Sequence, residues 1–297
     1  MDFISGKALI DICKNENIKI SEAMIRREME HFEPSREKVI DRMKNALEVM
    51  KDSTKRAFDN DLEMLGGYIG GESMALSKRI ASHGAMGGMI SKAAAYALGV
   101  LEVNASMGRI VAAPTAGSSG VLPGVLVAAQ EEYGFSDDEI IMALFNAGAV
   151  GYLISRNATV SGAEGGCQAE VGAASAMAAS ALCELFGGDP EQCLASAADA
   201  ISNILGLVCD PIGGLVEAPC QKRNAMGVAN AVVSAEINLS ISHSLVPFDE
   251  VVKIMKTVGS SMPYQLRETA LGGLATAPSV KAKAVSKCDA CGACSGK

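Results

Sequence analysis

The stretch Ala173-Ala-Ser-Ala-Met-Ala-Ala-Ser-Ala-Leu-Cys-Glu-Leu-Phe186 decides the fold of this chain. It consists mostly of residues with small side chains and contains neither Gly nor Pro, so it predicts a helix. Small side chains let neighbouring helices approach closely, which predicts a compact helical core with little aromatic filling. Strand signals are scarce in the chain, because Val and Ile seldom alternate with polar residues.

The same composition extends in both directions from this stretch. Ala, Gly, Ser and Met dominate from Leu65 to about Ala277, and aromatic residues make up only 4% of the chain. We therefore predict a mainly α fold with a single Ala/Gly-rich helical core and few or no strands. Gly/Pro elbows are expected between helices at Pro114–Gly120, Gly162–Gly166 and Pro211–Gly214.

Shifts in composition divide the chain into three regions. The residues before Leu65 are the most charged, and the residues after about 275 are rich in Lys, Ala and Ser. We expect a charged helical N-terminal region over residues 1–64, the catalytic helical core over 65–275 and a cysteine-tipped C-terminal tail over 276–297.

Local signals mark several helix ends. Ser136 and Glu139 form a capping box before an apolar run. Asp189 is followed by Pro at the first helical position and by Glu and Gln in the first turn. The spacing also predicts a helix from Pro34 to Phe58, and another from Phe248 to Val258 that stops at Gly259.

The charge and hydropathy of the chain argue against a nucleic-acid-binding protein and against a membrane protein. The 297-residue chain carries a net charge of −8, whereas phosphate binding needs a basic face, so we expect no nucleic-acid partner. No run approaches the ~20 apolar residues of a membrane span, and Met1 to Ile10 lacks the pattern of a signal peptide. We expect a cytoplasmic protein without a membrane partner.

Nine cysteines are unusual for such a chain. Disulfides are rare in a reducing cytoplasm, so the cysteines are either small buried hydrophobes or metal ligands. We interpret Cys13, Cys183 and Cys193 as packing residues. Cys167, Cys209 and Cys220 instead lie next to Gly and Pro, where amide N–H groups can point at sulfur. That environment suits a metal cluster, although burial as packing residues also fits it.

The C-terminal tail carries Cys288-x-x-Cys291-x-x-Cys294, which resembles part of a ferredoxin cluster loop. It lacks the rest of such a loop. Three interpretations fit: one ligand donated to a cluster held elsewhere, a separate metal site, or a redox-active tail.

Three segments together resemble the signature of the iron–sulfur-dependent L-serine dehydratases, across roughly Leu65 to Gly273. They are Asn104-Ala-Ser-Met-Gly-Arg-Ile-Val-Ala-Ala-Pro-Thr-Ala-Gly-Ser-Ser-Gly-Val-Leu-Pro-Gly124, Gly165-Gly-Cys-Gln-Ala-Glu-Val-Gly172 and Cys209-Asp-Pro-Ile-Gly-Gly-Leu-Val-Glu-Ala-Pro-Cys-Gln-Lys-Arg-Asn-Ala225. The chain lacks the Ser-Ser-His-Thr-type segment of the family's beta region. It therefore resembles the alpha subunit of the two-chain form, and the resemblance implies an L-serine dehydratase beta subunit as partner.

The resemblance implies a [4Fe–4S] cluster held by Cys167, Cys209 and Cys220, without pyridoxal phosphate. A C-terminal cysteine is the fourth ligand in some members of the family. Here that ligand is Cys288, with Cys291 or Cys294 as alternatives, because the chain does not end in a single terminal cysteine. The implied reaction converts L-serine to pyruvate and ammonia, with a cluster iron acting as Lewis acid on the serine hydroxyl.

Within the matching segments, the elbow before the apolar helix suits a carboxylate, because it presents N–H groups and hydroxyls to an anion. A plain Ser-rich helix cap is the alternative. Arg109 is a further polar candidate in the first segment, and the only candidate base in the chain is His83, with a surface histidine as its alternative. The resemblance places the favoured base on the beta subunit. The expected substrate-binding residues are Asn104, Thr115, Gly117, Ser118, Ser119, Gly120, Arg223 and Asn224.

Other functions fit part of the pattern. A related cluster-dependent lyase, such as a cysteine desulfidase or a hydroxy-acid dehydratase, shares the cluster and differs in substrate. A non-catalytic iron–sulfur carrier uses the tail as its cluster site. A pyridoxal enzyme needs a Schiff-base lysine, and the only lysine in the matching elbows is Lys222.

Overall fold

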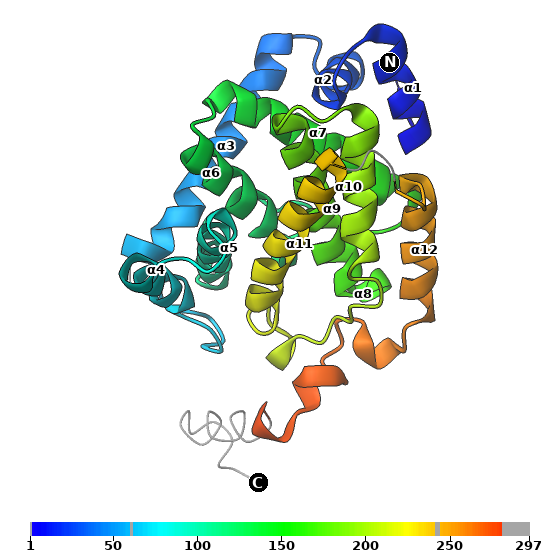
Figure 1. Cartoon of the computed structure of the whole chain (residues 1–297). Coiled ribbons are helices and arrows are strands. Elements are labelled where there is room, and N and C mark those ends of the chain that lie inside the picture. Colours follow the sequence, from blue (N-terminus) through cyan, green and yellow to red (C-terminus); the bar gives the residue numbers. More distant parts are fainter. Residues whose placement is uncertain (1, 60–61, 241–243, 281–297) are drawn as a thin grey trace.

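The computed structural model describes residues 2–59, 62–240 and 244–280. The Ala-rich stretch forms α9 (Ala173–Leu185), and its residues from Ala173 to Glu184 are all buried. α9 lies in the middle of the bundle and packs against four helices (Figure 1). These are α6 (Val121–Tyr133), α7 (Asp137–Asn157), α10 (Pro190–Ser202) and α11 (Cys220–Ser240).

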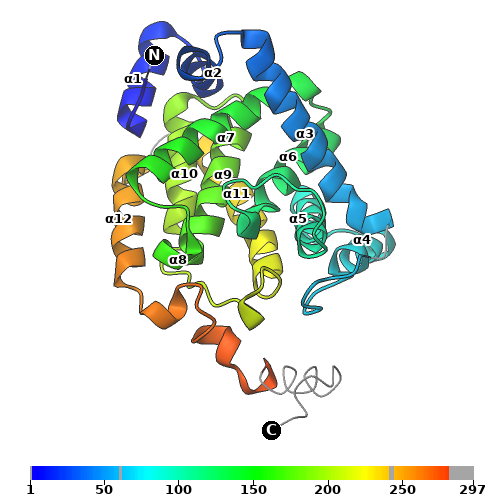
Figure 2. The same cartoon turned by 180° about the vertical axis from the view of Figure 1, so that it is seen from behind.

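The remaining helices form an outer layer around this centre (Figures 1 and 2). α2 lies against α7, α3 and α4 lie against α5, and α12 lies against α10. The described residues contain no strand, only one isolated bridge between Cys209 and Arg267. The predicted mainly α fold is confirmed. The outer helices are α1 (Gly6–Glu16), α2 (Ile20–His31), α3 (Arg36–Asp59), α4 (Glu72–His83), α5 (Met89–Ala105) and α12 (Phe248–Ser261).

Glycines set how closely the core helices approach. A Cβ at Gly227 on α11 would lie 2.9 Å from a methyl group of Val171, just before α9. A Cβ at Gly124 on α6 would lie 2.8 Å from the backbone oxygen of Ala93 on α5. Because backbone atoms cannot rotate away, α5 and α6 can stay at this distance only while residue 124 lacks a side chain.

This contact predicts opposite effects for two glycine substitutions in helices. Gly124→Ala should lower the free energy of unfolding by about 1–3 kcal/mol, because the overlap with Ala93 outweighs the gain in helix propensity. Gly148→Ala on α7 should raise it by about 0.5–1 kcal/mol, because the nearest atom to a new Cβ is 3.9 Å away. Chemical denaturation of both variants measures the difference, and equal shifts would contradict the packing argument.

A polar cluster is buried among the apolar side chains of the core. Glu184 of α9 accepts hydrogen bonds from the side chain of Asn146 (2.8 Å) and from the backbone of Ser21 (3.3 Å). Asn146 in turn accepts from Ser180 (2.6 Å). These bonds join α2, α7 and α9, and they satisfy a carboxylate that has almost no contact with solvent.

Among the described residues, α7 is the one helix long and apolar enough to cross a membrane. Of its apolar window, 67% is buried within the protein. The buried core helix of a water-soluble protein can have the same length and composition, so these two properties are only weak support for a membrane span. The burial of most of the apolar window identifies α7 as a core helix.

The predicted helix starts can be compared with the structure. The predicted capping box at Ser136 with Glu139 is confirmed. The predicted N-cap at Asp189 with Pro190 at the first helical position is also confirmed, and Gln192 completes a capping box there. The helix expected from Pro34 begins at Arg36, so the prediction that Pro34 takes the first helical position is wrong. The helix expected to stop at Gly259 continues to Ser261. A glycine lowers helix propensity but does not end a helix whose packing continues beyond it.

Candidate functional site

Two cysteines and a glutamate meet at the lower end of the bundle in Figure 1, where α8 (Gly162–Gly165) lies. The Oε2 atom of Glu170 lies 4.0 Å from the Sγ atom of Cys167 and 3.8 Å from that of Cys209. The three potential ligand atoms lie within 4.8 Å of one another, and all three residues are buried. Thiolate and carboxylate groups gathered in this way can hold a metal.

Local structure explains the position of each of these side chains. Cys167 directly precedes the π-helical turn η2 (Gln168–Gly172) that leads into α9, and Glu170 lies in it three residues further on, so their side chains lie on one face. Gly166, before that turn, has a φ of 75° and lies against the backbone of Leu207. A side chain there would be strained and would collide with that backbone, so glycine at this position permits the turn.

Cys209 is held by backbone pairing with the segment that follows α12. Its amide donates to Leu266 (2.9 Å), and its carbonyl accepts from Glu268 (2.8 Å). Next to it, the side chain of Asp210 accepts from the amide of Leu274 (2.6 Å). The chain after α12 therefore covers the part of the site that carries Cys209.

Cys220 is the first residue of α11 and is buried. Burial raises the pKa of its thiol to about 12, and the negative charge of nearby Cys167 adds to the rise. Its position at a helix N-terminus favours a thiolate once a cation binds there. Cys220 therefore lies near Cys167, but the group whose ligand atoms lie within 4.8 Å of one another consists of Cys167, Glu170 and Cys209.

One arginine compensates the negative charge at this end of the bundle. The Nη1 atom of Arg223 lies 2.7 Å from a carboxylate oxygen of Asp210 and 3.7 Å from the sulfur of Cys167. A hydrogen bond with Cys209 lowers the pKa of the Cys167 thiol, and Arg223 lowers it further. The hydrogen bond between the two thiols raises the pKa of Cys209. Arg223 thus stabilises negative charge at Cys167.

The predicted carboxylate elbow lies directly beside this group. It contains the short 3-10 helix η1 (Ala116–Ser118), and the hydroxyl of Thr115 donates to Glu170 (2.7 Å). Asn224 of α11 holds the elbow in position with two hydrogen bonds. Its side chain accepts from the amide of Gly120 (3.0 Å) and donates to the carbonyl of Gly117 (2.8 Å). It also donates to the carbonyl of Cys220 (2.9 Å).

The two serines of the elbow are fully buried. Ser118 shares a hydrogen bond with the hydroxyl of Thr115 (3.2 Å), and Ser119 donates to the carbonyl of Ala116 (2.8 Å). The amides of residues 118–120 are also occupied, whereas those of Ala116 and Gly117 make no hydrogen bond with any other described residue. The amide of Thr115 makes none either, so the elbow can offer the amides of Thr115, Ala116 and Gly117 to an anion.

Other predicted residues are not part of this group. His83 is the last residue of α4, is exposed and shares a hydrogen bond with Ser82 (2.7 Å), as the alternative of a surface histidine predicts. The side chains of Asn104, half-buried near the end of α5, and Arg109, exposed beyond it, form no hydrogen bond within the described residues. Cys288, Cys291 and Cys294 lie outside the described residues. The cysteines assigned to packing lie in the hydrophobic core, as predicted: Cys13, Cys183 and Cys193.

Sequence reasoning missed two acidic residues of the site, Glu170 and Asp210. Burial raises the pKa of the Glu170 carboxyl, and the charge of Glu268 adds to this. Both residues could have been found by their position next to predicted ligands, because Glu170 follows Cys167 by one helical turn and Asp210 follows Cys209 directly. A third missed residue, Glu217, accepts from the amides of Gly66 and Tyr68 and so holds the loop between Cys209 and Cys220.

Comparison with known proteins agrees with this arrangement. Residues 15–275 match the family model described as serine dehydratase alpha chain. The chain belongs to this family. The matched span of this serine dehydratase alpha chain includes Cys167, Glu170, Cys209 and Cys220, and it ends before Cys288.

Relatives of this serine dehydratase alpha chain fall into two lengths. The probable L-serine dehydratase alpha chain of Bacillus subtilis is 45% identical over 93% of this chain and 92% of its own length. The L-serine dehydratase alpha chain of Peptoniphilus asaccharolyticus is 46% identical, over 91% and 93% of the two chains. The L-serine dehydratase of Helicobacter pylori strain 26695 is 34% identical, and the matching region covers only 61% of its length.

Proposed function

We propose that this chain is the catalytic alpha chain of an L-serine dehydratase, a lyase that converts L-serine to pyruvate and ammonia. The observation that carries the proposal is the buried group of Cys167, Glu170 and Cys209, with Cys220 nearby, beside an elbow that has amides to offer an anion. Family membership supports the same activity.

The donor set fits an iron–sulfur cluster. The thiols of Cys167 and Cys209 are buried within 4.8 Å of each other, Cys220 is buried as well, and thiolate is the ligand that such clusters require. Arg223 offsets negative charge at Cys167, which favours the ligating form of the thiol. We assign Cys167, Cys209 and Cys220 as ligands of a [4Fe–4S] cluster and Cys288 as the fourth, with Cys291 or Cys294 as alternatives. Pyridoxal phosphate has no role in this proposal.

If the fourth cysteine gave way to the substrate, a bound cluster would supply a Lewis acid for the serine hydroxyl, which is otherwise a poor leaving group. The residues of the chain supply the rest of the site. The amides of Ala116 and Gly117 receive the substrate carboxylate, and Asn224 holds them in place. Arg223 is committed to Asp210 and Cys167, so it positions the cysteine rather than the substrate.

The base that removes the Cα proton comes from a separate beta chain in this proposal. His83 is exposed at the end of α4 and pairs with Ser82, so the structure gives it no link to the cysteines. Loss of water from serine and subsequent hydrolysis of the enamine product give pyruvate and ammonia. A reducing cytoplasm suits the free cysteines, and we propose neither a nucleic-acid nor a membrane partner.

The chain prepared alone, with iron and sulfide restored anaerobically, should bind a cluster and produce almost no pyruvate from L-serine. Addition of the beta chain should raise turnover by about 10²–10⁴-fold, the usual contribution of a general base. Pyruvate formation and iron content are the measurements. Full turnover by this chain alone would refute the placement of the base on the partner.

The same assay separates the alternatives. Sulfide release from L-cysteine without pyruvate formation from L-serine would identify a cysteine desulfidase, and turnover of hydroxy acids would identify a hydroxy-acid dehydratase. Reversible one-electron reduction without turnover would identify an iron–sulfur carrier. A pyridoxal absorbance band in a preparation without iron would overturn the cluster proposal.

A further inference from the structure

One face of α11 is exposed along much of the helix. Met226, Val233 and Ile237 are large apolar residues on this face, and all three are exposed. Their spacing of seven and then four residues places them on one side of the helix. The other side of α11 packs against α5, α9 and α10. The helix lies at the front of the bundle in Figure 1 and at the back in Figure 2, so its outer face points away from the rest of the described chain.

The exposed face of α11 continues into a groove beside it. The groove has a volume of about 490 Å³, and its walls include Val233 and Ile237 of α11, Tyr133 of α6, and Met89 and Ile90 of α5. Tyr133 is itself exposed. A continuous exposed apolar surface of this kind typically marks an interaction site.

Two opposite charges lie at the ends of this face. Lys222 precedes Met226 by one turn, Glu236 adjoins Ile237, and both charged residues are exposed. Neither side chain forms an ion pair with another described residue. Positions 222 and 236 are about 21 Å apart along a helix, and charges are screened beyond ~8 Å at physiological salt. The two charges therefore do not compensate each other within one chain.

The positions on this face are symmetric about Ala229, because Lys222 and Glu236 are equally far from it in sequence. If a second α11 packs antiparallel across a two-fold axis at Ala229, Lys222 of each copy faces Glu236 of the other. The small side chain of Ala229 lets the helices approach closely at the axis. Met226 then falls opposite Val232, which lines the groove, and the flexible methionine side chain suits an irregular gap.

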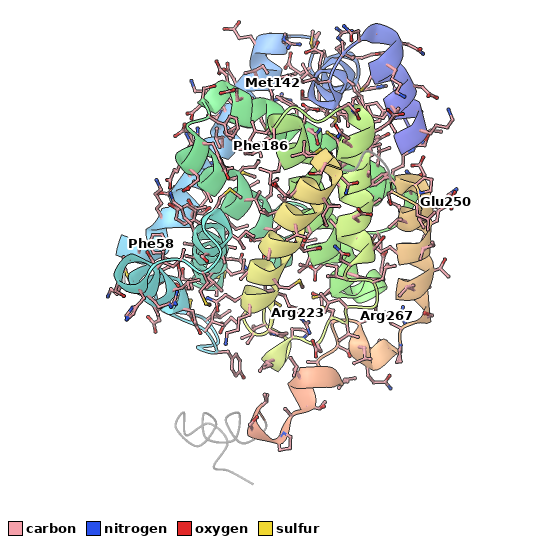
Figure 3. The ribbon with its side chains drawn as sticks, viewed as in Figure 1. Phe58, Met142, Phe186, Arg223, Glu250 and Arg267 are labelled. Carbon is pink, nitrogen blue, oxygen red and sulfur yellow. The ribbon has the colours of Figure 1, made fainter. Side chains whose placement is uncertain are left out.

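We propose that this face binds a second copy of the chain, with the two α11 helices antiparallel about a two-fold axis at Ala229. The charges select this occupant, because a face with Lys at one end and Glu at the other is complementary to itself in the antiparallel orientation. Such a contact closes after two copies. Arg223 marks the lower end of α11 in Figure 3, where the cysteine site lies, so each copy keeps its own site at an outer end of the contact.

The test measures self-association of the full chain by analytical ultracentrifugation, with iron and sulfide restored anaerobically and without a beta chain. The wild type should form a dimer. Lys222→Glu and Glu236→Lys should each raise the dimer dissociation constant by about 10- to 50-fold, because each reversal turns two symmetric attractions into repulsions. The double variant should return to within about threefold of the wild type, since every pair again has opposite signs.

Two further variants test the apolar part of the contact. Val233→Asp should raise the dissociation constant by more than about 50-fold, because the contact would bury a charge. Ile254→Asp changes a residue of similar exposure on the outer face of α12 (42% against 46% for Val233) and should leave the constant unchanged. If Val233→Asp does not fold, the charge reversals still decide the question, because Lys222 and Glu236 are exposed polar positions.

Several outcomes would overturn the proposal. The wild type could remain monomeric up to about 100 µM, well above the dissociation constant of a specific dimer. A double variant that associates as weakly as the single variants would exclude the antiparallel arrangement. Equal effects of Val233→Asp and Ile254→Asp would exclude the α11 face. If addition of the beta chain separates the wild-type dimer, the face belongs to the beta chain rather than to a second copy.

Discussion

Replacing Cys167 with alanine is expected to abolish cluster binding, with iron falling from about four atoms per chain to less than about one. Cys167 belongs to the buried group of potential ligands, and Arg223 stabilises negative charge on its thiol. Without it, Cys209 and Cys220 provide only two ligands in the core of the site. Iron and acid-labile sulfide, measured anaerobically, should fall together with pyruvate formation. Cys209→Ala and Cys220→Ala should have the same effect.

Two controls show whether the loss is specific. Cys183→Ala removes a cysteine that is also fully buried but lies in the hydrophobic core on α9, so iron should stay at the wild-type level. A chain truncated after Lys287 loses all three tail cysteines and should retain a cluster that is more sensitive to oxygen. If the truncated chain holds no iron while Cys167→Ala keeps it, the tail is the cluster site and the carrier hypothesis is correct.

Asn224→Ala is expected to weaken both the fold and the binding of L-serine. The side chain is fully buried and bonds the amide of Gly120 and the carbonyls of Gly117 and Cys220. Its removal leaves the two elbow groups unsatisfied, at about 1–3 kcal/mol for each. The elbow amides should also lose their fixed position. Chemical denaturation should show the loss of stability, and KM for L-serine should rise.

Asn230→Ala on the same helix is the matched control. Asn230 is half-buried, and it bonds the carbonyl of Ala200 (2.7 Å) and the side chain of Asn203 (2.8 Å), far along α11 from the elbow. Its loss should cost about 1 kcal/mol of stability and leave KM unchanged. A rise in KM of equal size in both variants would mean that Asn224 acts only through general stability.

Features that depend on neighbouring residues were predictable from the sequence. Helix formation by the stretch from Ala173 to Phe186 follows from its composition, and the capping boxes at Ser136 and Asp189 follow from spacing within one turn. Helix ends were less predictable where packing decides them, as at Arg36 and after Gly259. Neighbouring positions at which a helix can begin or end differ little in local free energy, so tertiary contacts select among them.

Composition and spacing predicted the helical class and the packing cysteines, and the resemblance added three candidate ligands. The folded chain places Glu170 beside Cys167 and Cys209, and Arg223 beside Asp210. Glu170 and Cys209 are 39 residues apart, and Asp210 in a loop meets Arg223 on α11; chain spacing does not specify distances between such separate elements. The space for Glu170 likewise depends on Gly117 and Gly162, two glycines that meet only when the elbows fold together.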